Sequence, residues 1–128
     1  MDRGNHAPIQ FALARQAAAG TARLYADAGF AVAIDDVLFP VEAEVLFGEA
    51  FTGCAFHRIA LRPTVQVALA RNAGRKTKPF DPAFLTATIR DLEQAMTTQP
   101  FAEYGWIVID TSNLSVEESV DLILVQDL

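Results

Sequence analysis

The chain has 128 residues, of which 52% are hydrophobic and 20% are charged, so it can build a core and is not expected to be disordered. The net charge of −6 argues against general binding of nucleic acid. A lone cysteine, Cys54, excludes an internal disulfide, and no apolar run approaches the ~20 residues that span a bilayer. The start shows no signal-peptide pattern. These features predict one cytoplasmic domain over residues 1–128, with neither membrane nor nucleic acid as a partner.

The first part of the sequence predicts two helices and a strand. Residues 8–28 place apolar side chains on two adjacent helical faces, which predicts a largely buried helix that Gly29 closes. The apolar run over residues 30–34 is typical of a strand covered on both faces, as in parallel sheets. Residues 41–50 are then expected to form a short helix. The two faces of the first helix are Ile9, Leu13, Ala17 and Leu24, and Phe11, Ala14, Ala18, Ala22 and Tyr25.

The remainder continues the alternation of helices and strands. Strands are expected over residues 55–61 and 106–109, and helices over residues 63–72 and 81–96. Ser115 and Glu118 form a capping-box pattern that opens a last helix. Alternating elements of this kind predict an α/β fold with a mostly parallel sheet. The inner face of the last helix is expected to contain Val116, Val120, Ile123 and Leu124.

Polar residues follow all three expected strands, at the sheet edge where open α/β folds bind ligands. Asp35 and Asp36 follow the first strand, Arg62 follows the second, and residues 110–113 follow the third. A carboxylate in such a place can hold Mg²⁺ through water or orient a substrate hydroxyl. A single aspartate there more often caps the next segment, whereas the pair after an apolar strand favours a function.

A compact basic segment separates two of the expected helices. It contains four of the ten basic residues of this acidic chain, Arg71, Arg75, Lys76 and Lys78, within eight positions. Such a segment suits a small anionic ligand better than a long polyanion, although a solvated basic loop explains it equally well. Arg71 and Arg75 are four residues apart, so one face of a helix end could present both. Arginines there can neutralise charge on a transferring phosphoryl group.

The order and spacing of these elements resemble the P-loop small-molecule kinases and phosphotransferases of the chloramphenicol phosphotransferase-like and AAA-type ATPase-like group. The resemblance covers the chain from about Ala7 onward. It implies a P-loop kinase-like three-layer fold with a mostly parallel sheet, missing its first two strands, and a lid around residues 71–80. The matching stretches are Tyr25–Asp36, Leu61–Pro63, Leu69–Arg75, Trp106–Ser112 and Ser115–Ser119.

The same resemblance implies a function, which is ATP-dependent phosphoryl transfer to a small molecule. It implies ATP and Mg²⁺ as cofactors, and a nucleotide and a small-molecule acceptor as partners. The implied roles are catalysis for Asp35, Asp36 and Arg75, Mg²⁺ binding for Asp36, and nucleotide binding for Arg71, Arg75, Thr111 and Ser112.

The chain departs from this family because it contains no G-x-x-x-x-G-K-[ST] loop, which holds the phosphates and Mg²⁺. The strand before that loop, which lies centrally between the strands expected at 30–34 and 55–61, is absent as well. Three outcomes stay open: the two strands pair directly, a homodimer forms through unpaired strand edges, or the natural protein starts upstream of Met1. The alternative function is a degenerate, non-catalytic module for nucleotide binding or dimerisation.

Overall fold

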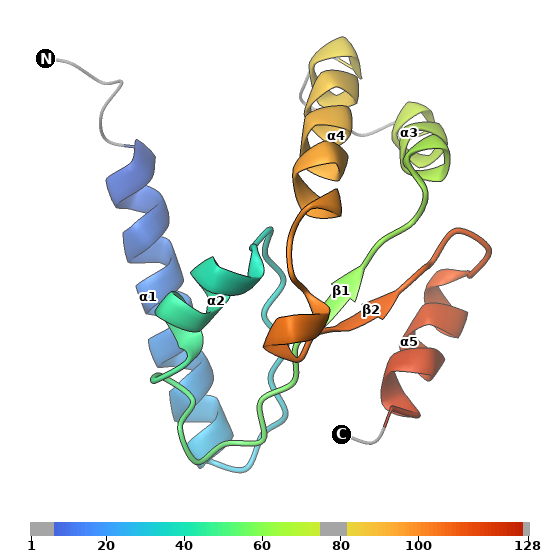
Figure 1. Ribbon diagram of the computed structural model, residues 1–128. Coiled ribbons are helices and arrows are strands. Elements are labelled where there is room, and N and C mark those ends of the chain that lie inside the picture. Colours follow the sequence, from blue (N-terminus) through green and yellow to red (C-terminus); the bar gives the residue numbers. More distant parts are fainter. Residues whose placement is uncertain (1–6, 75–81, 127–128) are drawn as a thin grey trace, which may run out of the picture. The chain divides into compact units, whose positions relative to one another are not determined.

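The computed structural model describes residues 7–74 and 82–126 (Figure 1). The chain divides into two compact units, Met1–Phe56 and His57–Leu128, and each is described by itself. Helices in both units and a parallel strand pair in the second make this a mixed α/β fold, as the sequence predicts. In the described ranges, no helix combines the length and the apolar character that crossing a membrane requires. The single-domain organisation stays a prediction.

The first unit contains two helices, α1 (Ala7–Asp27) and α2 (Pro40–Phe47), which pack against each other. Ala19 and Ala22 of α1 are buried against Phe47 and Phe51. The small side chains on α1 let these aromatic rings approach closely, and the rings of Phe47 and Phe51 stack with centroids 5.7 Å apart. The residues packed around this centre are Leu38, Leu46, Ala50, Cys54 and Phe56.

Helix α1 ends in a Schellman motif, which confirms the prediction that Gly29 closes it. Gly29 has a φ of 94°, a conformation that favours glycine. Its N–H donates to the carbonyl of Ala26 at 3.0 Å, and the N–H of Phe30 donates to the carbonyl of Tyr25 at 3.0 Å. The rings of Tyr25 and Phe30 add the hydrophobic contact of this motif, with centroids 5.7 Å apart.

The strand predicted over residues 30–34 is wrong, because residues 30–39 form no regular secondary structure. The side chains of Phe30, Val32 and Ile34 are 62%, 45% and 37% exposed. A strand needs a hydrogen-bonded neighbour, and no described segment supplies one here. The apolar pattern therefore identified a strand-forming sequence but not a strand.

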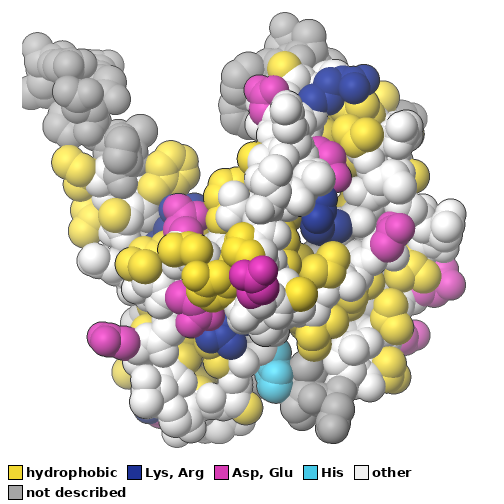
Figure 2. All heavy atoms as spheres, in the orientation of Figure 1, with side chains coloured by type: hydrophobic (Ala, Val, Ile, Leu, Met, Phe, Trp, Pro, Cys, Tyr) yellow, Lys and Arg dark blue, Asp and Glu magenta, His cyan; other side chains and the backbone are white. Residues whose placement is uncertain are grey.

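The prediction that α1 is largely buried is also wrong. Only the face that carries Ala19 and Ala22 is covered, because the eight-residue α2 is too short to cover more of a helix of 21 residues. Figure 2 shows many hydrophobic side chains, in yellow, at the surface. Those exposed on α1 are Ile9, Phe11, Leu13, Leu24 and Tyr25.

The second unit contains a parallel pair of short strands, β1 (Ile59–Leu61) and β2 (Ile107–Ile109), in the register Ile59 to Ile107. Parallel strands need a long crossover, and here it includes α3 (Val65–Ala73), α4 (Pro82–Thr97) and the 3₁₀ turn η1 (Ala102–Tyr104). Helices α3 and α4 pack against each other. The parallel direction is as predicted, and both strands are shorter than expected.

Helix α5 (Val116–Leu124) follows β2 and begins with the predicted capping box. The Ser115 hydroxyl accepts the Glu118 N–H at 3.0 Å, and the Glu118 carboxylate accepts the Ser115 N–H at 3.0 Å. The predicted inner face is wrong for Val116, Val120 and Leu124, which are exposed. Ile123 of that predicted face is partly covered, and so is its neighbour Leu122.

The two glycines at the middle and end of α1 provide a matched stability test. Gly29→Ala is expected to destabilise the protein by about 1 kcal/mol, because its φ of 94° strains any residue with a Cβ atom. Gly20→Ala is the control, since Gly20 lies inside the helix with no atom within 4 Å of an added Cβ. It is expected to stabilise by about 0.5–1 kcal/mol. Chemical denaturation measures both, and equal effects would contradict the assignment of the helix end.

Candidate functional site

The parallel pairing brings the carboxyl ends of β1 and β2 to one edge of the sheet. The N–H of Arg62 donates to the carbonyl of Ile109 at 2.8 Å, so the pairing continues one residue beyond β1. Residues 62–64 and 110–114 then leave the sheet as neighbouring segments. Open α/β sheets bind ligands at this edge, which makes the two segments the candidate site.

Ser112 connects the two segments through its hydroxyl group. This hydroxyl accepts the N–H of Thr64 at 2.8 Å and donates to Asp110 Oδ1 at 2.6 Å. The N–H of Ser112 also donates to Asp110 Oδ1, at 2.9 Å. The hydroxyl of Ser112, followed by its N–H, lowers the pKa of Asp110, and the charge of Arg71 acts in the same direction. Asp110 is therefore held as a carboxylate.

Arg71, in the last turn of α3, holds the segment that follows β2. Its Nη2 donates to the carbonyl oxygens of Thr111 at 2.6 Å and Leu114 at 3.4 Å, and its Nη1 donates to Thr111 Oγ1 at 3.3 Å. Thr111 is buried, whereas Ser112 is partly exposed. The structure thus brings together Arg71, Thr111 and Ser112, three of the predicted nucleotide-binding residues. The Arg71 guanidinium is occupied by carbonyl groups of the protein itself.

Arg62 is fixed on the α4 side of the same edge. Its Nη2 lies 2.9 Å from Glu93 Oε1, and its guanidinium lies 5.9 Å from the ring centroid of Phe101. The ring of Phe101 in turn meets Trp106 edge-on at 5.5 Å. Within the described part of the chain, Arg62 Nε and Trp106 Nε1 are buried without a hydrogen-bond partner. These contacts make Arg62 an anchor between β1 and α4.

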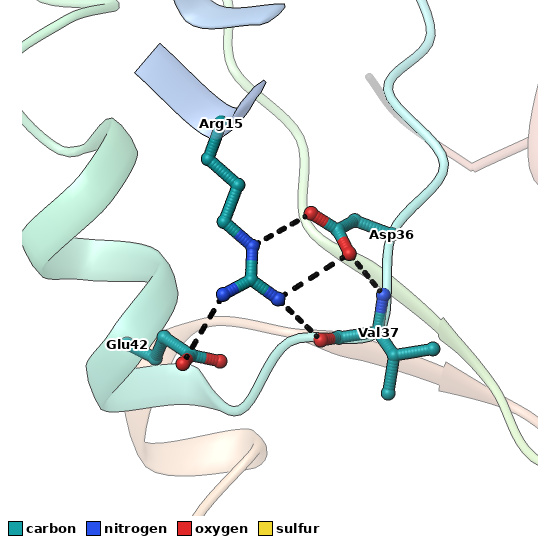
Figure 3. A network of polar contacts seen from close by, with 4 residues as sticks. All are labelled: Arg15, Asp36, Val37 and Glu42. Carbon is teal, nitrogen blue, oxygen red and sulfur yellow. Dashed lines mark hydrogen bonds and ion pairs between the residues drawn. The ribbon is translucent and has the colours of Figure 1, made fainter. Parts of the chain in front are cut away.

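The first unit contains a separate polar network around Asp36 (Figure 3). Arg15 Nε donates to Asp36 Oδ2 at 3.0 Å, and Arg15 Nη2 donates to the Val37 carbonyl at 3.2 Å. Arg15 Nη1 lies 3.5 Å from Glu42 Oε2. The bond to Asp36 raises the pKa of Arg15 above its ordinary value, followed by the charges of Asp36 and Glu42. This network fastens residues 36–42 to α1.

The arrangement at Asp36 does not fit the implied Mg²⁺ site. Mg²⁺ requires an octahedral set of oxygen ligands, and the Arg15 cation lies against both Asp36 and Glu42. Among the residues in the described ranges, no group of three His, Cys, Asp or Glu side chains could hold a metal. Asp35 is exposed and makes no hydrogen bond with the other described residues. Arg75 and residues 75–80 of the expected lid lie outside the described residues.

The contacts that position these groups were not visible in the sequence. Arg15, Thr64 and Glu93 were missed because each pairs with a residue more than twenty positions away. A surface groove of about 330 Å³ lies beside α5 and contains none of the predicted site residues. It is lined by Leu114, Glu118, Asp121, Leu122 and Val125.

The chain was compared with protein-family models, curated proteins and solved structures, and no significant match was found in any of the three.

The hydrogen bonds of Ser112 lead to a test by titration. Ser112→Ala is expected to raise the pKa of Asp110 toward its ordinary value of 3.8. The substitution removes the hydrogen bond from the Ser112 hydroxyl, which is the largest cause of the lowered pKa. Carboxyl ¹³C NMR against pH measures this shift. In the wild type the lowered pKa stabilises the fold above pH 3.8, and this contribution is lost as pH falls through the lower folded-state value. The stability difference between variant and wild type should therefore be largest at neutral pH and should shrink in strong acid to the part that comes from the lost Thr64 hydrogen bond.

The control for this titration is Glu118. Its pKa is lowered first by the N–H and then by the hydroxyl of Ser115, with no part played by Ser112. The Glu118 titration should therefore be the same in both proteins. An unchanged Asp110 titration in Ser112→Ala would contradict the assigned hydrogen bonds.

Proposed function

We propose that this chain forms the nucleotide-base and acceptor side of an ATP-dependent small-molecule phosphotransferase. Catalysis would require a phosphate-binding loop that the sequence does not contain. The observation that supports the proposal is the meeting of Arg71, Thr111 and Ser112 at the carboxyl edge of a parallel strand pair. Ligands bind at this edge in open α/β sheets, and the resemblance implies nucleotide binding by these three residues.

The residues at the edge would act by positioning the backbone. Arg71 fixes the carbonyl groups of Thr111 and Leu114, and Ser112 joins this segment to Thr64. A backbone held in this way presents its remaining N–H and C=O groups in a fixed pattern, which can hydrogen-bond the edge of a base. Arg71 and Arg15 provide no comparable arrangement for phosphates, because Arg71 donates to carbonyl groups and Arg15 to Asp36. At the described site, binding would therefore depend on the base.

A second candidate is a non-catalytic module for nucleotide binding or dimerisation. It is favoured by the contacts of Asp36 and Arg71, two of the residues with a predicted role in catalysis or nucleotide binding. Asp36 is paired with Arg15, and Arg71 supports a loop. A module that had lost phosphoryl transfer would keep such contacts, since they stabilise each unit.

Titration with adenosine and with MgATP tests the first proposal. We expect both ligands to shift the NMR amide signals of Thr111 and Ser112, with Kd values on the order of 1 mM that agree within about threefold, because the described site offers contacts to the base. Val116→Ser, at an exposed position of α5, is a control that should leave binding unchanged. The absence of any shift at these amides would contradict nucleotide binding. MgATP binding a hundredfold tighter than adenosine would show that a phosphate site exists after all.

The coding DNA provides an independent test of the phosphotransferase proposal. We expect the region upstream of the Met1 codon to encode, in frame, a G-x-x-x-x-G-K-[ST] loop preceded by an apolar strand. Sequencing the locus and its transcript measures this directly. An in-frame stop codon with no such motif between it and Met1 would leave the non-catalytic module as the better proposal.

A further inference from the structure

The edge of β1 that faces away from β2 has backbone groups that no described residue pairs. The carbonyl of Arg58 accepts the Ile107 N–H, and the Arg62 N–H donates to Ile109, both at 2.8 Å. Successive residues of a strand direct their backbone groups to opposite edges, so those of Ile59 and Leu61 point away from β2. The Leu61 side chain is also 49% exposed. Such an edge is a template for the addition of another strand.

Residues 30–34 complement this free edge, because they have the sequence of a strand but pair with no other strand of the described residues. Their sequence, FAVAI, has the β-branched and aromatic residues that favour strands and a common strand length. All five side chains are exposed. The segment is fixed at one end by the Gly29 motif and at the other by the Asp36–Arg15 ion pair. A segment held at both ends loses less conformational entropy when it pairs.

We propose that residues 30–34 of one copy pair with the free edge of β1 in a second copy, so that two copies exchange strands. This inference rests on the dimerisation candidate of the proposed function and names its interface. A two-fold exchange would form two identical strand pairings, as expected for a symmetric dimer. It would cover the side chains of Phe30, Val32, Ile34 and Leu61, which are exposed in the single chain.

The charges on the two strands favour β1 over β2 as the acceptor. Along β2 the backbone groups of Val108 and of the following Asp110 point to the outer edge, by the same alternation. Asp110 is exposed and held as a carboxylate by Ser112. Charged residues beside an edge oppose the addition of a strand. The outward groups of β1 belong to the uncharged residues Ile59 and Leu61.

Sedimentation velocity over a range of concentrations tests the exchange. The wild-type chain should move from its monomer mass of 13.9 kDa toward twice that mass as concentration rises. Hydrogen exchange should slow at residues 30–34 and 59–61 over the same range. Val32→Lys should raise the dimer dissociation constant at least about tenfold, because the added charge opposes pairing. Leu61→Lys should do the same from the acceptor strand.

Val116→Lys is the matched control, since it places the same charge at an exposed valine of α5. It should dimerise like the wild type, and circular dichroism confirms that each variant is folded. A peptide of residues 28–36, AGFAVAIDD, should convert the dimer to monomer, whereas a scrambled peptide should not.

A wild-type monomer at all concentrations would overturn both the exchange and the dimerisation candidate. A dimer that Val32→Lys and Leu61→Lys leave intact would overturn the exchange alone. Adenosine binding is read from Thr111 and Ser112, so failure of the nucleotide proposal is distinguishable from failure of the exchange.

Discussion

The arrangement of the second unit depends on the parallel pairing of β1 with β2. Parallel strands end at the same edge, so this three-residue pairing is what places residues 62–64 beside residues 110–114. Every contact at the candidate site then follows, including the bond from Thr64 to Ser112 and the bonds from Arg71 to Thr111. These contacts also stabilise the pairing, because they hold the chain just beyond it. The site and the sheet therefore support each other.

Three arginines show how the two units use positive charge. Arg15 binds Asp36, Arg62 binds Glu93, and Arg71 binds backbone carbonyls. Each joins segments far apart in the sequence, and charged hydrogen bonds of this kind are stronger than neutral ones. Arg71, which the resemblance assigns to nucleotide binding, donates instead to carbonyl groups of the protein itself and acts as a structural support. A basic residue predicted to bind an anion must also be free to do so, and this depends on its partners.

The sequence was a good guide where the determining residues lie close together. The end of α1 at Gly29 and the capping box at Ser115 depend on residues within five positions of each other, and both are as predicted. The strand at 30–34 and the buried face of α5 depended on partners that periodicity does not identify. At the candidate site, too, local features could be predicted from the sequence and long-range contacts could not. The edge at Thr111 and Ser112 could be predicted from strand order, whereas its contact with Arg71 joins residues 40 positions apart.

The exposed apolar run at residues 30–34 has a physical cause in the small sheet. Runs such as 30–34 have the composition of strands in parallel sheets, which are covered on both faces and paired on both edges. The sheet of the described chain has only two short strands and cannot meet either condition. The resemblance and the strand exchange would each add the strands that this sheet lacks. Under the resemblance a further segment of the polypeptide would insert a strand, and under the exchange a second copy would contribute one. In both cases residues 30–34 would gain the pairing that the two-stranded sheet of the described residues does not give them.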